Sequence, residues 1–200
     1  MVRPRPDDLG ERSNWIGGFY ELAIELGEPD DARLEDALKA MWQAAGATGP
    51  FGGYYENEIV SEVPLELASL ERHGHLRGVV EAPGFGPVVA GALALRYESD
   101  PDWILFYLPM GALLNANPII GGFPVGSAAP AAVWRVPLDA WFADIGRRVY
   151  SNVRFVQAAI GFESSGDAWE GDGHLVPAGD AVTYIPARLD LDIMTFDHPR

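Results

Sequence analysis

The sequence lacks cysteine entirely and has one lysine, Lys39, among its 200 residues. Without cysteine there can be no disulfide, no thiolate nucleophile and no cysteine-ligated zinc or iron–sulfur site. A phosphate-binding loop of the G-x-x-x-x-G-K-[ST] type and a G-x-S-x-G nucleophile elbow are also missing from the sequence. The sequence therefore gives no support to nucleotide binding or to hydrolysis by a serine or cysteine nucleophile.

Positive charge is scarce. Lys and Arg total 14 against 29 Asp and Glu, which gives a formal net charge of −15. Proteins that bind nucleic acids neutralise phosphates with basic side chains, so this charge argues against a nucleic-acid partner. Because opposite charge speeds association, a basic protein is the expected partner.

Two long segments contain acids but no base, and each can be either a solvated surface or a contact surface. The acids of segment 40–71 are Glu56, Glu58, Glu62, Glu66 and Glu71, and those of segment 155–187 are Glu163, Asp167, Glu170, Asp172 and Asp180.

Charge of either sign is absent between Asp102 and Arg135. A segment that excludes charge is usually buried or faces something other than water. Residues 103–108 read as a strand that is apolar on both faces and therefore central in its sheet. Residues 109–134 read as a long connection, too apolar for an ordinary loop and too interrupted by Pro and Gly to span a bilayer. We expect this connection to join the core, line a pocket or form a homo-oligomer interface.

The N-terminal arginines are not followed by an apolar segment, which argues against a signal peptide. We predict a flexible tail over residues 1–13 and a single α+β domain over residues 14–200. We expect a cytoplasmic protein that does not associate with membranes.

Apolar periodicity predicts the regular elements. Alternation over 19–26 predicts a half-buried strand, and the apolar stripe over 34–45, which ends at Gly46, predicts a helix. A second helix is predicted to start near Pro137, a favoured first-turn residue. Further strands are predicted at 76–82, 87–97, 103–108, 154–162, 181–185 and 189–196.

The order of these elements predicts an α+β fold, with a mainly antiparallel sheet and two main helices on one face. Strand–helix units at the two ends are consistent with a ferredoxin-like plan that carries extra strands. The glycine-rich segment 46–58 is predicted to be a loop, and 64–72 is compatible with a strand or a short helix.

The segment GFESSGDAWEGDGHL is the main candidate for a metal site. Hard cations prefer several oxygen ligands on a flexible loop, and a bound metal can activate water. The alternative is a mobile acidic loop without a ligand. The candidate ligands are Glu163, Asp167, Glu170, Asp172 and His174.

Two weaker patterns involve paired side chains. His73 and His75 form H-x-H, but the intervening Gly74 favours an exposed turn over a pair of metal ligands. Asp190 and Asp192 share one face of a predicted strand, where a solvated outer edge is favoured over an acid–base pair.

Aromatic residues gather near the glycine-rich segments, where they can complete the core or form an interface. They are Trp15, Phe19, Tyr20, Phe51, Tyr54 and Tyr55.

The favoured hypothesis is a non-enzymatic protein-binding module without a cofactor, of the immunity or antitoxin type. It would present Tyr54, Tyr55, Glu56, Glu58 and Glu62 to a basic partner. The alternative is a metal-dependent or small-molecule enzyme whose pocket is formed by loop 109–134 and the acidic loop 163–174.

Overall fold

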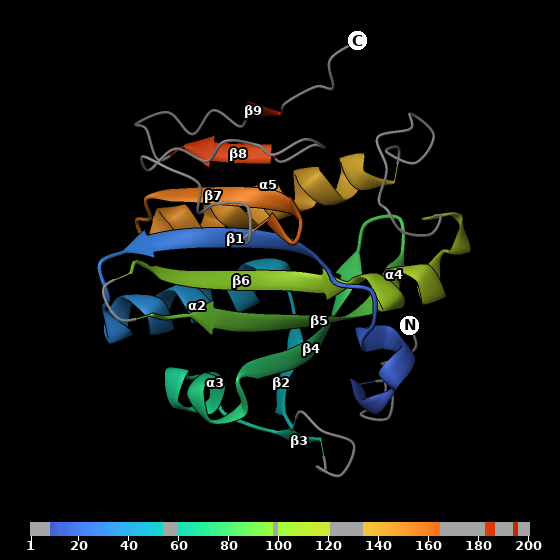
Figure 1. Cartoon of the computed structure of the whole chain (residues 1–200), viewed down its shortest axis with the longest axis horizontal. Helices are drawn as coiled ribbons and strands as arrows, with labels where there is room; N and C mark the ends of the chain where they lie inside the picture. Colours follow the sequence, from blue (N-terminus) through green and yellow to red (C-terminus); the bar gives the residue numbers. More distant parts are fainter. Residues whose placement is uncertain are drawn as a thin grey trace.

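The computed structural model describes residues 9–53, 60–97, 100–120 and 134–164, together with two short strands at 183–186 and 194–195. The fold is α+β, as the sequence predicts, with one antiparallel sheet in the order β3-β2-β4-β5-β6-β1-β7-β8-β9 (Figure 1). The elements are η1 (Arg12–Trp15), β1 (Phe19–Gly27), α2 (Asp31–Ala45), β2 (Thr48–Gly52), β3 (Ser61–Glu62), α3 (Leu67–His73), β4 (His75–Ala82), β5 (Gly86–Leu95), β6 (Asp102–Pro109), α4 (Met110–Ala116), η2 (Pro118–Ile120), α5 (Arg135–Asn152), β7 (Gln157–Phe162), β8 (Thr183–Pro186) and β9 (Met194–Thr195).

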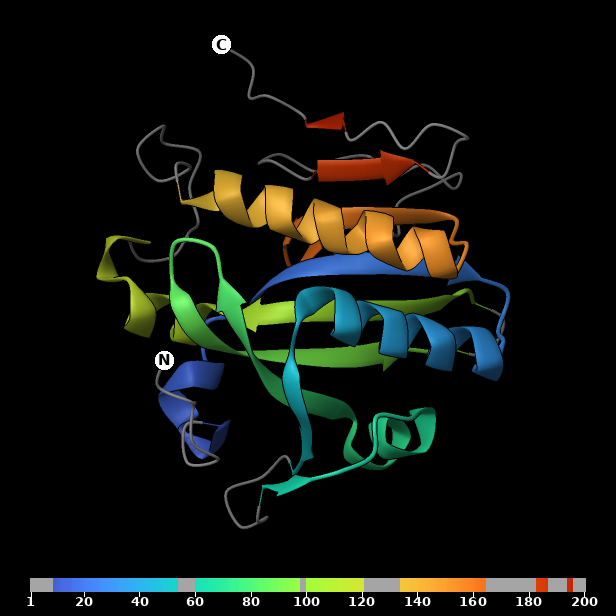
Figure 2. The same cartoon turned by 180° about the vertical axis from the view of Figure 1, so that it is seen from behind.

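The centre of the sheet has the strand order of a ferredoxin-like plan. Strands β5, β6, β1 and β7 lie side by side, and both β6 and β7 are antiparallel to β1. Helix α2 follows β1, α5 precedes β7, and both helices cover the same face of the sheet (Figure 2). The extra strands extend this core at both edges, with β2, β3 and β4 beyond β5 and with β8 and β9 beyond β7.

The main core lies between the sheet and the two long helices. Alternate residues of β1 point toward the helices, and Tyr20, Leu22 and Ile24 are fully buried there. Helix α2 contributes its predicted apolar stripe, is capped by the side chain of Asp30 and ends at Gly46 in the left-handed conformation. The helical and strand periodicities therefore place these apolar residues in one core.

Two segments differ from their sequence-based interpretation. Part of 46–58, predicted to be a loop, forms β2, which pairs with β4 despite its Gly and Pro content. The hydrogen bonds to β4 stabilise this strand, although the local propensity of its residues does not favour one. Segment 64–72, which is compatible with a strand or a short helix on its sequence, contains most of the short helix α3.

The charge-free segment is partly explained by the fold. Strand β6 is buried on both faces, as predicted. The expectation of an irregular connection from residue 109 is wrong for 110–120, which form α4 and η2. Met110 and Leu113 of α4 enter the chain's own core, so the core covers this part. Residues 121–133 lie outside the described part of the chain, and their role as core, pocket or interface stays a prediction.

The expectation of a flexible tail is wrong for residues 9–13, whereas residues 1–8 are not described. Leu9 is 1% exposed, and η1 lies directly on α4. A Cβ atom added at Gly111 would lie 2.2 Å from the carbonyl oxygen of Ser13. No helix within the described ranges is long and apolar enough to cross a membrane.

Candidate functional sites

Glu62 is the predicted partner-binding residue that the structure describes. It is exposed on β3, at the edge of the sheet, and is paired in register with Phe51. The other four residues proposed for this surface, Tyr54, Tyr55, Glu56 and Glu58, lie outside the described residues. Of the remaining aromatics, Tyr20 is fully buried, while Trp15, Phe19 and Phe51 are half-buried.

Strand β3, to which Glu62 belongs, directly precedes α3 in the chain, and both lie in the lower part of the molecule in Figures 1 and 2. The start of α3 is tied to α2, because the backbone N–H of Leu67 donates to Glu35 Oε2 over 3.0 Å. We call this surface the acidic end. It consists of Asp31, Glu35, Asp36, Glu62, Glu66 and Glu71, all exposed except the half-buried Glu35.

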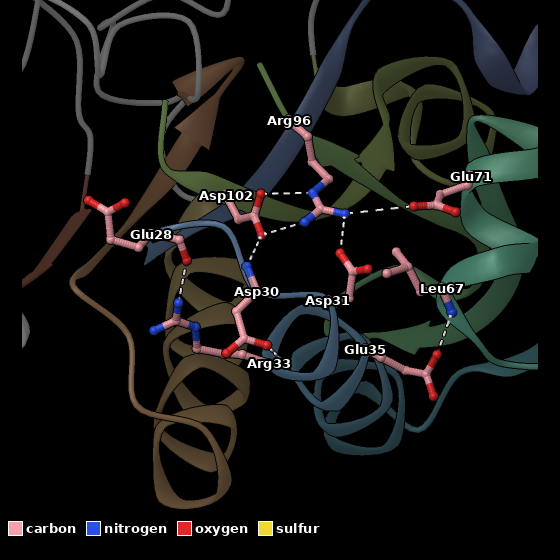
Figure 3. A network of polar contacts seen from close by, with 9 residues as sticks. All are labelled: Glu28, Asp30, Asp31, Arg33, Glu35, Leu67, Glu71, Arg96 and Asp102. Atoms are coloured by element: carbon pink, nitrogen blue, oxygen red, sulfur yellow. Dashed lines mark hydrogen bonds and ion pairs between the residues drawn. The ribbon is translucent and has the colours of Figure 1, made fainter. Parts of the chain in front are cut away.

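The helices α2 and α3 also carry Arg33 and Arg72, but two other cations at the acidic end, Lys39 and Arg96, are paired with carboxylates. Lys39 Nζ lies 2.5 Å from Glu35 Oε1. Arg96 contacts Asp31 at 2.7 Å and Glu71 at 3.7 Å, so it links the start of α2 to the last turn of α3 (Figure 3). Asp102, which is 1% exposed, accepts two hydrogen bonds from Arg96, of 2.8 and 3.2 Å, and so holds the guanidinium in place. The acidic end therefore has a defined shape and keeps a surplus of negative charge.

The predicted metal site is described at only one of its five positions. Glu163 is exposed and has a φ of 46°, and its backbone N–H donates to the carbonyl oxygen of Phe19 over 2.9 Å. Asp167, Glu170, Asp172 and His174 lie outside the described residues. Within the described ranges, no group of three or more His, Asp or Glu side chains is arranged to hold a metal ion. A metal site in this loop stays a prediction.

The expectation of an exposed H-x-H turn is wrong for His75. His75 is 6% exposed at the start of β4, while His73 is half-buried at the end of α3. The ring of His73 lies against Gly52, where an added Cβ would be 2.6 Å away. The two imidazoles therefore have separate structural environments. Asp190 and Asp192 are not among the described residues.

The sheet face opposite α2 and α5 contains a buried polar group around His75. Its Nδ1 lies 2.5 Å from the hydroxyl oxygen of Tyr107, and its Nε2 accepts from Arg77 Nε over 3.3 Å. The guanidinium carbon of Arg77 lies 4.6 Å from the ring centroid of Trp15, and Arg77 also donates to the carbonyl oxygen of Leu9 over 3.0 Å. Burial, followed by the charges of Arg77 and His73, lowers the pKa of His75 to about 4.

A second buried polar group connects β1 to the first turns of α5. The Tyr20 hydroxyl donates to Asp139 and accepts from Arg135 Nε over 2.9 Å. Burial raises the pKa of Tyr20 and that of Asp139, which keeps the tyrosine protonated. Tyr20 and Asp139 are 119 positions apart in the sequence, so no local pattern indicates this contact.

These two buried groups satisfy polar atoms inside the fold rather than form an open site. One signal in the sequence marks the first of them. Arg77 is a charged residue in the mainly apolar segment LRGVV, residues 76–80, and it alternates with His75. Period-two spacing places both side chains on one face, so the pair was detectable, but the partner Tyr107 is distant in sequence.

Comparisons with protein-family models, with curated proteins and with solved structures found no match to the chain.

Proposed function

We propose that this chain is a non-enzymatic protein-binding module that uses its acidic end to bind a basic protein, as an immunity or antitoxin-type inhibitor does. The observation that carries the proposal is the exposure of carboxylates on α2 and α3, which the Leu67–Glu35 bond and Arg96 hold together, and of Glu62 on the neighbouring edge strand β3. This placement supports a contact surface because three separate elements contribute charge of the same sign.

Electrostatic complementarity gives the proposal its physical basis. Clustered carboxylates at a surface attract a basic patch over long range and so raise the association rate. Arg96 contacts Asp31 and Glu71, while Lys39 contacts Glu35 and also lies within electrostatic reach of Asp36 and Glu66, so these two cations offset part of the negative charge of this surface. A basic partner would supply the missing positive charge.

The test is a binding measurement with the basic proteins that are encoded next to the gene for this chain. Two variants, Glu62→Lys and Glu81→Lys, change the net charge equally, and both replace an exposed strand residue. Glu62 belongs to the acidic end, whereas Glu81 lies near the C-terminal end of β4, away from α3. We expect Glu62→Lys to weaken binding about tenfold and Glu81→Lys to change it little.

Added salt should reduce the association rate of the wild-type chain, because exposed charges are screened. The partner's own activity should be inhibited by the wild-type chain and less by Glu62→Lys. Equal effects of the two substitutions, or no binding by any basic neighbour, would contradict the proposal.

The alternative, a metal-dependent enzyme, makes a different prediction. A metal that binds only the folded chain raises its melting temperature, and Glu163→Gln should reduce that rise. A rise with Ca²⁺, Mg²⁺, Mn²⁺ or Zn²⁺ that exceeds the effect of matched ionic strength would favour the alternative.

A further inference from the structure

Residues 9–16, which we call the strap, lie across the sheet face opposite α2 and α5. The Leu9 side chain is buried with Val79, Val89 and Ala112, which belong to β4, β5 and α4. At the other end of the strap, the carbonyl oxygen of Ile16 accepts from the backbone N–H of Gly111 over 2.9 Å. The strap is therefore attached at both ends to elements that follow it in the chain.

A glycine pair joins the strap to β1. Gly17 and Gly18 have φ values of 85° and 79°, in the region that favours glycine. A Cβ atom added at Gly18 would lie 2.6 Å from Glu163 Oε1, so a larger residue would not fit there. Strand β1 itself is paired on both sides, with β6 and β7. The glycine pair is therefore the point at which the strap can turn away from β1, and the carbonyl oxygen of Gly18, on the β1 side of this point, accepts from the backbone N–H of Met110 over 3.0 Å.

The contacts that fasten the strap meet at Arg77. Its guanidinium lies over the Trp15 ring, and its Nη1 donates to the Leu9 carbonyl oxygen. The Trp15 Nε1–H donates to the same oxygen over 2.9 Å. Arg77 thus connects both ends of the strap to β4.

The position of Arg77 depends on a neutral His75. Because Arg77 Nε donates to His75 Nε2, the ring proton lies on Nδ1, which donates to the Tyr107 hydroxyl. Protonation would place a hydrogen on Nε2, remove the bond from Arg77 and put two cations side by side.

The charged and titratable groups around His75 come from several elements. They are Arg77 of β4, His73 of α3, Tyr107 of β6, Glu21 of β1 opposite Tyr107 in register, and the exposed Glu11 and Arg12 at the strap.

We propose that the strap is a pH-controlled device, hinged at Gly17 and Gly18, that protonation of His75 releases from Arg77. This inference does not depend on the proposed function.

The direction of the effect follows from the pKa of His75. Burial is the largest cause that lowers the pKa of His75 to about 4, and release of the strap would reduce this burial and raise the pKa toward its ordinary value of 6.5. The docked form therefore loses stability as the pH falls from 6.5 toward 4, because the released form takes up the proton first. A full return to 6.5 would lower the ratio of docked to released chains on the order of a hundredfold between pH 7 and pH 4, and the charges of Arg77 and His73, which remain nearby, would reduce this response.

The test is hydrogen exchange of the full chain at pH 7 and pH 4, expressed as protection factors that correct for the intrinsic effect of pH. It compares the wild type with His75→Gln, which is neutral and keeps a donor and an acceptor. The comparison variant is His73→Gln, because His73 contacts Gly52 rather than the strap. Its charge is the smallest of the causes that lower the pKa of His75, so its removal should keep the response and shift its midpoint slightly to higher pH.

We expect protection of the strap amides and of the Gly111 amide to fall by up to about a hundredfold in the wild type. Protection of β1 and β6 should persist, His75→Gln should remove the response, and His73→Gln should retain it. Two results for the wild type alone would overturn the proposal: a strap that stays protected at pH 4, or a strap that loses protection together with the sheet. An undiminished response in His75→Gln would also overturn it.

Discussion

Gly91 has no room for a side chain, because Tyr107 of the neighbouring strand lies across it. An added Cβ would lie 2.3 Å from Tyr107 Cζ and 2.4 Å from its hydroxyl oxygen. The tyrosine cannot move freely, since its hydroxyl is bonded to the buried His75. The close approach of Tyr107 thus explains a glycine in the middle of β5, where glycine is otherwise unfavourable.

We predict that Gly91→Ala lowers the free energy of unfolding by about 1–3 kcal/mol through overpacking. Gly10→Ala is the matched control, because nothing lies within 4 Å of its added Cβ. It should change stability by less than about 0.5 kcal/mol. Urea titrations of both variants measure the difference, and similar midpoints would contradict the assigned contact.

The second prediction at residue scale concerns Asp139. Burial raises its pKa above the ordinary 3.8, so the folded chain keeps this proton at a pH where the unfolded chain has released it. The contribution of Asp139 to stability is therefore fully present below pH 3.8 and is lost as the pH rises through the folded-state pKa. We expect wild type to lose stability relative to Asp139→Asn as the pH rises toward neutrality.

Urea unfolding of the wild type and of Asp139→Asn at a series of pH values measures this difference. The hydrogen bond from Tyr20 lowers the pKa of Asp139, so Tyr20→Phe should raise this pKa further. The loss of stability with rising pH should therefore be larger in Tyr20→Phe than in the wild type. A difference between wild type and Asp139→Asn that is constant with pH, or of opposite slope, would show that Asp139 has no raised pKa.

At the scale of elements, Asp102 joins the β5–β6 hairpin to the start of α2. It accepts two bonds from Arg96 and one from the backbone N–H of Asp30 over 3.0 Å (Figure 3). Asp30 in turn caps α2 through the N–H of Arg33. The carboxylate at position 102 therefore sets where the helix begins relative to the sheet.

We predict that Asp102→Asn lowers the free energy of unfolding by roughly 1–3 kcal/mol, because it weakens a charge-assisted hydrogen-bond network at a buried position. Lys39→Gln, which breaks an exposed pair on the same helix, should cost less than about 0.5 kcal/mol. Hydrogen exchange should also accelerate in the first turn of α2 in Asp102→Asn alone. Equal costs for the two substitutions would contradict the assigned role of Asp102.

The sequence predicts the long elements well and the short ones poorly. Helix α2 and strands β1 and β6 have periods or apolar runs that specify their burial, and the structure confirms them. Strand β2 and helix α4 were not foreseen, because β2 depends on pairing with β4 and α4 on contact with η1. Local composition contains neither contact.

The same limit applies to the candidate sites. Exposed acids are visible in the sequence, so Glu62 could be assigned to a surface before the structure was known. The environments of His75 and Asp139 cannot be predicted from the sequence, because each depends on a partner far along the chain. The partner of His75 is Tyr107, and that of Asp139 is Tyr20. Distant pairs of this kind arise only from the strand order and helix placement.

At the scale of the whole molecule, the net charge of −15 opposes compaction. Exposed carboxylates exceed the basic residues near them at the acidic end, and the ion pairs there are partly exposed. Repulsion should therefore dominate the long-range electrostatics of the folded state.

We predict that moderate NaCl raises the melting temperature, because screening weakens repulsion more than it weakens the exposed ion pairs. For a chain of this size, about 1 kcal/mol corresponds to roughly 2–4 °C. Glu62→Gln combined with Glu66→Gln should raise the melting temperature at low salt and reduce its response to NaCl. Asp144→Gln is the control, since this carboxylate is paired with Arg148 on α5 and its loss should give no comparable gain. A melting temperature that falls with salt would mean that attractive pairs, rather than repulsion at the acidic end, dominate the electrostatics of this fold.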